Sequence, residues 1–371
     1  MALSSTQTGV SNHVSVSHDE AQRQLGICNS CRYCEGYCGA FQALTRYRSF
    51  DEATVSHMAN LCHNCRGCYY ACQYTEPHEF ALNIPALFAD VRAQSWEQHV
   101  RPGVITQLMQ QKVWPYVVLV LFFVVVLSAA TGTSWWSDSP FYSSISHNTM
   151  VAIFLPLFLL PLIAVSLGVR SYWKSVGGQS LQLKDLQGAC KSAATLKQLS
   201  GGQGQGCNFE SGERYSSFRR WAHQASMYGF LLCFLSTSTA TVYHYLFDYP
   251  APYPLLSLPK LLGVTGGILL SVGCAFLLYL KRKAESSLGS VKRHRAEYAF
   301  VTLLLAVGVT GLLLYWAAGT GLAASLLIIH LAVVAAFFLA IPYSKMTHGF
   351  FRLAALCREE QLKSVDSQAQ N

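Results

Sequence analysis

Charged residues are scarce in this chain. Only 12% of its 371 residues are Asp, Glu, Lys or Arg, whereas 51% are hydrophobic. The first 20 residues lack the apolar stretch of a secretory signal peptide, so we expect the N-terminal part to stay in the cytoplasm, where thiols remain reduced. No G-x-G-x-x-G fingerprint follows a strand pattern, which argues against an FAD-binding domain in this chain.

Cysteine, by contrast, is concentrated: eight of the 13 cysteines form two runs with the spacing C-x2-C-x2-C-x3-C. Three thiolates at steps of three surround one corner of an iron–sulfur cube, and in two-cluster ferredoxins the fourth cysteine reaches the other cube. Structural zinc is usually held by two separated pairs, and disulfides are rare in the cytoplasm. We therefore predict two [4Fe–4S] clusters rather than zinc or disulfides. The predicted ligand sets are Cys28, Cys31, Cys34 and Cys72, and then Cys62, Cys65, Cys68 and Cys38.

Gly39 and Gln73 follow the fourth cysteines, where bacterial ferredoxins carry proline. Between the runs, apolar residues at 41, 44, 47, 50, 55 and 58 recur at helical spacing. This favours an α-helical ferredoxin over the compact β-rich one. We thus predict a mostly α fold, in which an α-helical two-cluster ferredoxin-like module precedes a six-helix transmembrane bundle.

The apolar residues gather after Lys112 into six stretches near the roughly 20 residues that a bilayer core requires. We place the spans at 113–131, 149–170, 223–246, 258–280, 298–317 and 322–343. The predicted domains are a disordered tail at 1–24, a cytoplasmic double-cluster module at 25–105, a membrane domain at 106–357 with a flexible cytoplasmic loop at 174–222, and a tail at 358–371 that is disordered from Ser364.

The basic residues predict the topology. The connections at 132–148, 247–257 and 318–321 contain no Lys or Arg, whereas those before the third and fifth spans are rich in both. Because positive charge marks the cytoplasmic side, we expect both termini in the cytoplasm. These inside loops account for the net charge of +8, so the charge calls for no nucleic acid partner.

Histidine inside a bilayer is costly and therefore a functional hypothesis. A rise of 1.5 Å per residue puts His223 and His244 about 32 Å apart on the third span. It puts His330, in the sixth span, about 27 Å from His348, just past the inner end of that span. Since these spans run antiparallel, we predict that His223 faces His348 near the cytoplasm and that His244 faces His330 near the outside. Such pairs are typical of one or two bis-histidine b-type haems held between helices.

The other histidines have weaker claims. His147 and His294 lie in predicted loops and are expected to be ordinary residues. His57, His63 and His78 border the cysteine runs, where they either tune the clusters or have no role in them.

Six stretches resemble those of a known family. They are CRYCEGYC at 31–38, CHNCRGCYYACQY at 62–74, RRWAHQASMYGFLLCF at 219–234, STSTATVYHYL at 236–246, APYP at 251–254 and IPYSKMTHGFFRLAAL at 341–356. Through them, residues 25–357 resemble the tricarballylate-utilisation protein B family, also called the citrate-utilisation protein B family. Relatives are expected to carry a His-His pair before Gln224, where this chain has the single His223.

The resemblance implies a membrane-bound electron-transfer subunit of the bacterial inner membrane. Its implied partner is an FAD-dependent tricarballylate dehydrogenase, whose electrons pass through two [4Fe–4S] clusters and b-type haem to the quinone pool. No catalytic residue for the acid chemistry is then expected here. Two alternatives stay open: the same relay serving a different flavoprotein, or a membrane redox sensor, which would need an output module that we do not predict after His348.

Overall fold

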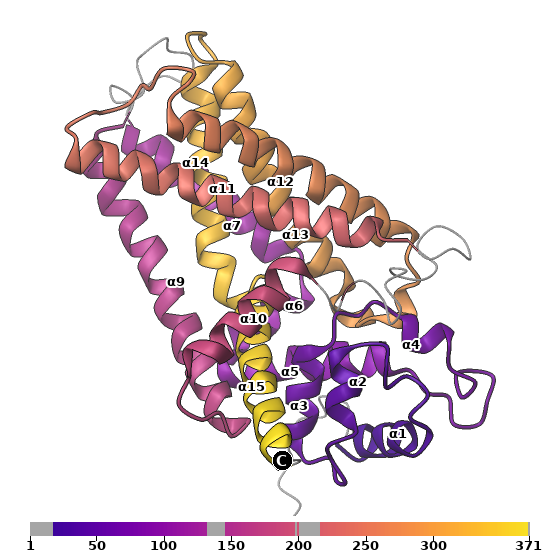
Figure 1. Cartoon of the computed structure of the whole chain (residues 1–371). Helices are drawn as coiled ribbons and strands as arrows, with labels where there is room; N and C mark the ends of the chain where they lie inside the picture. Colours follow the sequence, from indigo (N-terminus) through magenta and orange to yellow (C-terminus); the bar gives the residue numbers. More distant parts are fainter. Residues whose placement is uncertain (1–17, 132–144, 197–198, 200–215, 370–371) are drawn as a thin grey trace, which may run out of the picture.

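The computed structural model describes residues 18–131, 145–196, 199 and 216–369. Among these residues every regular element is a helix, as the sequence predicts. Figure 1 shows short helices of the N-terminal part gathered at one end of the molecule and long helices extending away from them. The two groups correspond to the predicted module and the predicted membrane bundle.

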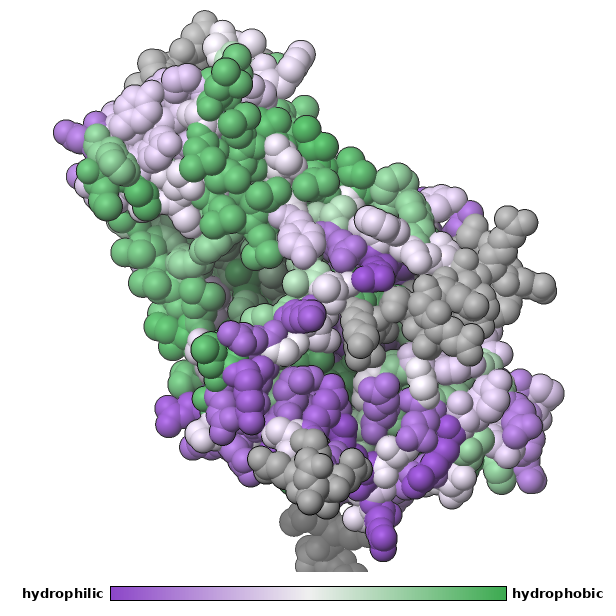
Figure 2. Space-filling model, viewed as in Figure 1, coloured by the Kyte–Doolittle hydropathy of each residue, from purple (hydrophilic) through white to green (hydrophobic). Residues whose placement is uncertain are grey.

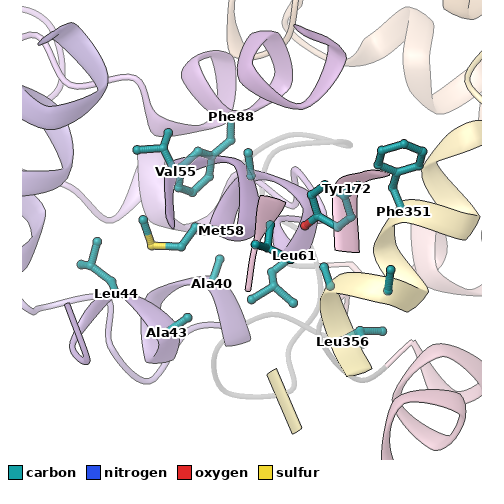
Figure 3. Packing of buried hydrophobic residues seen from close by; sticks show 14 of the residues in the cluster. Ala40, Ala43, Leu44, Val55, Met58, Leu61, Phe88, Tyr172, Phe351 and Leu356 are labelled. Carbon is teal, nitrogen blue, oxygen red and sulfur yellow. The ribbon is translucent and has the colours of Figure 1, made fainter. Parts of the chain in front are cut away.

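The N-terminal module consists of short helices whose ends are fixed by side chains. Its elements are α1 (His18–Cys31), α2 (Gly39–Leu44), α3 (Glu52–Leu61), α4 (Gly67–Tyr70) and α5 (Ile84–His99). The Asp51 carboxylate accepts a hydrogen bond from the Thr54 N–H at the start of α3, and the Asn83 amide oxygen caps α5 in the same way. Between these helices Val55, Met58 and Phe88 pack in one buried core (Figure 3).

Six helices are long and apolar enough to cross a membrane, close to the predicted spans. They are α7 (Trp114–Thr131), α9 (His147–Ser175), α11 (Phe218–Leu246), α12 (Leu258–Lys283), α13 (His294–Trp316) and α14 (Ala323–Ala340). Large apolar side chains such as Leu155, Leu160 and Leu167 of α9 point outward and are more than half exposed. Figure 2 shows this hydrophobic surface over the long helices and a hydrophilic surface over the module. The chain is therefore a membrane protein with a polar end.

Helices α11 and α12 pack side by side through glycines (Figure 1). A Cβ on Gly229 of α11 would clash with the backbone of Leu270 of α12, and one on Gly273 would lie 2.5 Å from the Ser226 nitrogen. Small residues let helix backbones approach closely in lipid. This contact fixes the course of α11, which carries two of the predicted haem ligands.

The last helix, α15 (Thr347–Ala369), joins the two halves of the molecule. Its Phe351 is fully buried beside Tyr172 from the C-terminal end of α9, and both belong to the core of the N-terminal module (Figure 3). Arg46 also pairs with Glu359 at 2.8 Å. A second link is formed by Arg293, which contacts Asp90 and Glu97 of α5, each at 2.8 Å. The module is thus packed against one end of the membrane bundle.

Three predicted boundaries differ from the structure. The predicted C-terminal tail is helical as far as residue 369 instead of disordered, because the apolar face of α15 is buried against α10 (Leu183–Thr195) and the module. For the same reason the connection at 174–222 contains a packed helix; residues 197–198 and 200–215 lie outside the described residues. The helix α1 already begins at His18, so only residues 1–17 of the predicted N-terminal tail lie outside the description.

Candidate functional site

The two cysteine runs lie on loops between short helices. The first begins in the last turn of α1, where Cys28 and Cys31 share a face at i, i+3, and ends at Cys38, directly before α2. The second begins at Cys62, directly after α3, and passes through α4 to Cys72. Both runs therefore present their thiols from helix ends and connecting loops.

The fourth cysteine of the second run lies near the first three of the first run. Burial raises the pKa of the Cys28 thiol to about 12, and three neighbouring thiolates add to the shift: those of Cys72, Cys34 and Cys31. Burial likewise raises the pKa of the Cys34 thiol to about 12, and the thiolates that add to this shift are those of Cys72, Cys31 and, from the other predicted set, Cys65. Apart from Cys65, these neighbours are the members of the first predicted ligand set.

The fourth cysteine of the first run, Cys38, lies near the first three of the second run. Burial raises the pKa of Cys38, and the thiolates that add to this shift are those of Cys65 and Cys62. One cavity is lined by Cys38, Cys62, Cys65 and Cys68 together. These four thiols are the members of the second predicted set.

The loop of the second cysteine run has two left-handed residues, and backbone N–H groups donate to two of its sulfur atoms. Asn64 and Arg66, between cysteines of the second run, adopt left-handed backbone conformations with φ of 53° and 67°. The Asn64 N–H donates to Cys62 Sγ at 3.3 Å, and the Tyr74 N–H donates to Cys72 Sγ at 3.3 Å. Hydrogen bonds of this kind stabilise thiolates, the form that binds iron.

Among the described residues, no three His, Cys, Asp or Glu side chains stand close enough to hold a single metal ion. The donor set nevertheless fits iron–sulfur chemistry, because eight free thiols lie in the loops of one module and four of them line a common cavity. The ligand assignment itself stays a prediction.

The predicted inner histidine pair comes together. The rings of His223 on α11 and His348 on α15 lie 6.0 Å apart between centroids, at 89° to each other. These two histidines are thus the residues that would hold the predicted inner haem.

The hydrogen bonds of the same two rings leave one nitrogen of each ring unused. His348 Nδ1 lies 2.5 Å from the Lys345 carbonyl oxygen, to which it donates, so Nε2 is the deprotonated nitrogen. Burial lowers the pKa of His348 to about 3, which keeps the ring neutral. Nδ1 of His223 is buried and has no hydrogen-bond partner within the described residues. Both rings thus retain a nitrogen that is available to a metal.

The predicted outer pair does not come together. The His244 ring stacks on His147, with centroids 3.9 Å apart and planes at 23°. His330 Nδ1 instead lies 2.9 Å from Thr310 Oγ1 of α13. The physical reason is packing: α11 lies along α12, whereas α14 packs mainly against α7 and α13. His147, which sequence reasoning treats as ordinary, is therefore the neighbour of His244, and two stacked rings cannot bind one iron from opposite faces.

Two arginines hold the cysteine loop, and one of them, Arg352, lies on the same helix as His348. Sequence reasoning overlooks both arginines. Arg352 donates to the Cys62 carbonyl oxygen at 3.2 Å and contacts His63 Nδ1 at 2.6 Å. Arg92 donates to the same carbonyl at 2.6 Å. The available signal was position: Arg352 follows His348 by four residues, which places both on one face of a helix.

The three histidines near the cysteine runs have different surroundings. His63 is buried beside Arg352, and burial, then the charge of Arg352, lowers its pKa well below the usual range. His57 Nε2 bonds the Ala355 carbonyl oxygen at 3.1 Å, and His78 Nδ1 accepts from the Phe80 N–H at 3.1 Å. Only His63 therefore lies between a candidate cluster loop and the histidine pair.

Taken together, the fold and the site define a helical membrane protein that carries a ferredoxin-like cysteine module at one end. The family model for Citrate utilization protein B matches residues 101–370, and that for the Citrate utilization protein B Fer4-like domain matches residues 21–98. The chain is also 39% identical over 345 residues to Citrate utilization protein B of Escherichia coli, covering 91% of each chain. It therefore belongs to the citrate utilization protein B family. No solved structure matches it.

Proposed function

We propose that this protein carries electrons from the reduced FAD of a tricarballylate dehydrogenase to the membrane quinone pool, in support of tricarballylate or related tricarboxylate catabolism. The relay would use two [4Fe–4S] clusters and b-type haem. One observation carries the proposal: the loop of the second cysteine set is held against α15 by Arg352, one helical turn from the histidine pair.

The exposure of the two cysteine sets suggests the order of transfer. Cys31 of the first set is exposed, and the adjacent Tyr33 is 67% exposed, so this end is open to a partner. The second set is covered by the module and by α15. Electrons would therefore enter at Cys28, Cys31, Cys34 and Cys72 and leave through the other set.

The residues of this chain hold and position the redox groups. The eight thiolates would bind the clusters, while His223 and His348 would bind the inner haem through neutral imidazoles. When bound, these groups supply single-electron transfer between a two-electron donor and a two-electron acceptor. Arg352 and Arg92 hold the intervening loop by its carbonyl oxygens, which fixes the separation of the two sites.

The orientation and the location belong to the same proposal. The basic connections would place both termini and the module in the cytoplasm, with the six helices in the bacterial inner membrane. The His244 and His330 assignment for an outer haem has no support from the contacts of either ring. A single inner haem is thus the simplest form of the relay.

A cofactor assay on the purified full-length protein tests the proposal. We expect about eight non-haem iron and eight sulfide per chain, with a b-type haem band in the reduced-minus-oxidised spectrum. His223→Ala and His348→Ala should lose that band, whereas His330→Ala and His244→Ala should keep it if there is only an inner haem. A colourless preparation without acid-labile sulfide would refute the relay.

The donor is tested separately. The protein alone should not oxidise tricarballylate, whereas addition of the purified dehydrogenase with tricarballylate should reduce its haem. If another flavoprotein reduces the haem and the tricarballylate dehydrogenase does not, the relay stands and the donor assignment is wrong.

A further inference from the structure

A small pocket with both apolar and polar lining residues lies where the N-terminal module meets the inner ends of the first, fifth and sixth spans. Its walls come from α5, the segment from α6 (Gly103–Gln111) to α7, the start of α13 and the segment after α14. Its polar lining residues are Gln110, Tyr116, Arg293, Glu297 and Lys345. The pocket is therefore at the membrane edge that faces the module.

Gln110 is the first sign that this pocket takes a ligand. The residue is only 5% exposed, and neither its Oε1 nor its Nε2 has a hydrogen-bond partner among the described residues. A buried polar group left without a partner costs about 1–3 kcal/mol. The amide thus lines the pocket with both a donor and an acceptor unused.

Lys345 supplies a second donor. Its ammonium contacts Glu297, which also pairs with Lys281 at 2.5 Å, so the carboxylate is shared between two lysines. The same ammonium lies 5.9 Å from the Trp96 ring centre. The pocket therefore combines an aromatic wall with two groups that can donate hydrogen bonds.

The pocket also adjoins both candidate redox sites. The Lys345 carbonyl oxygen accepts the hydrogen bond from His348 Nδ1. On the other side, Arg92 lies over the Trp96 ring at 6.0 Å and donates to the Cys62 carbonyl oxygen. A ring bound in this pocket would be separated from the inner histidine pair by Lys345 and from the second cysteine set by Arg92.

We propose that this pocket binds the head group of a membrane quinone, with Gln110 and Lys345 donating to its carbonyl oxygens and Trp96 packing against its ring. The inference rests on the proposed function and names the site where its acceptor binds. Each quinone would gain two electrons, delivered singly and derived from the reduced flavin, and two protons from the aqueous side of the module, giving the hydroquinone.

The lining side chains leave room for about one water molecule in this structure. A quinone ring can therefore enter only when flexible side chains such as Met109, Gln110 and Lys345 move aside. The alternative is that the pocket holds a single buried water molecule and no quinone.

Photolabelling with a short-chain azido-quinone tests the site on the purified full-length protein, with decylubiquinone as competitor and mass spectrometry of the labelled peptides. We expect competed label within 93–116 or 341–348. Gln110→Leu and Lys345→Met should each reduce it about tenfold, the effect of one lost hydrogen bond to a ligand. Gln361→Leu is the matched control, because Gln361 is equally buried but bonds the Gln179 and Ser180 carbonyls elsewhere.

The outcomes separate this inference from the function on which it rests. Label in other segments, no competed label, or label unchanged in both variants would overturn the site. If the iron, sulfide and haem contents and the reduction of quinone by dithionite-reduced protein persist in that case, the relay stands and only the pocket is wrong. A wild-type protein that lacks these cofactors would refute the relay itself.

Discussion

Arg352 donates a hydrogen bond to the carbonyl oxygen of Cys62 at 3.2 Å. Its guanidinium also contacts the Leu61 carbonyl and His63, so one side chain of α15 holds the start of the second cysteine run at three points. His348 lies one turn earlier on the same helix. A single rigid helix therefore sets the position of the candidate cluster loop relative to the candidate haem ligand.

Removal of the Arg352 charge should lower the midpoint potential of the second cluster. Burial lowers the pKa of Arg352 to about 9, which leaves the group protonated at neutral pH, where its positive charge favours the reduced cluster. One charge about 8 Å away at an effective dielectric constant of about 20 corresponds to a shift of about 50–100 mV. We expect this negative shift in Arg352→Gln by redox titration followed by electron paramagnetic resonance.

Arg358→Gln is the control for that measurement, because Arg358 lies on the same helix but donates to the Val176 carbonyl oxygen instead. Equal shifts in both variants would show that Arg352 has no special influence on the cluster.

Paired cysteine substitutions should reveal the crossed ligand sets. If the sets are crossed, Cys31→Ala with Cys72→Ala damages one cluster and leaves about four non-haem iron per chain, whereas Cys31→Ala with Cys38→Ala damages both. Uncrossed sets predict the reverse result for the two double variants. Iron and sulfide counts on the purified proteins, taken together, distinguish the two patterns.

Gly229→Ala should separate α11 from α12. The new methyl group would meet the Leu270 backbone and lie 2.9 Å from the Gly266 oxygen, neither of which can rotate away. Overpacking of this kind typically costs about 1–3 kcal/mol. We expect lower thermal stability in detergent and loss of haem with the non-haem iron retained, because α11 carries His223 but none of the eight candidate cluster cysteines.

The matched control is Gly263→Ala on α12, where the only close neighbour is the Ser236 side chain at 2.9 Å. If this variant loses as much haem as Gly229→Ala, backbone contact between the helices is not the cause.

His57 should make stability depend on pH. Burial lowers its pKa to about 4 from the usual 6.5, so below pH 6.5 the unfolded chain binds a proton that the folded chain does not. The free energy of unfolding should therefore fall between pH 6.5 and pH 4, by about 1.4 kcal/mol per unit and about 3 kcal/mol in all.

His57→Gln isolates this effect, since glutamine can donate to the Ala355 carbonyl oxygen without titrating. The stability difference between wild type and variant should shrink by about 2 kcal/mol from pH 7.5 to pH 5 in denaturant titrations. A difference that stays constant over this range would show that His57 does not titrate as its burial implies.

Some features of this protein were evident from local sequence. The cysteine spacing predicts a two-cluster module, and apolar stretches of about 20 residues predict the six helices that the structure contains. Helical periodicity between the cysteine runs also anticipates α2 and α3, with Phe41 and Met58 in the core. Each of these inferences depends on residues that are near one another in the chain.

The histidines show where such reasoning ends. Antiparallel spans of matching length predict both His223 with His348 and His244 with His330, yet only the first pair meets. Helix length fixes the depth of a residue in the bilayer but not which helices are neighbours. That choice depends on surface fit, as the glycines between α11 and α12 show.

The sequence by itself determined the number and spacing of the candidate cofactor ligands and the lengths of the apolar helices. It could do so because donor type, spacing and hydrophobic length are local properties of the chain. Only the tertiary structure decided that α15 returns to the module, that Arg352 reaches Cys62, and that Gln110 and Lys345 line one pocket. These contacts join residues more than 200 positions apart, and they arise from burial of apolar faces whose partners no local pattern specifies.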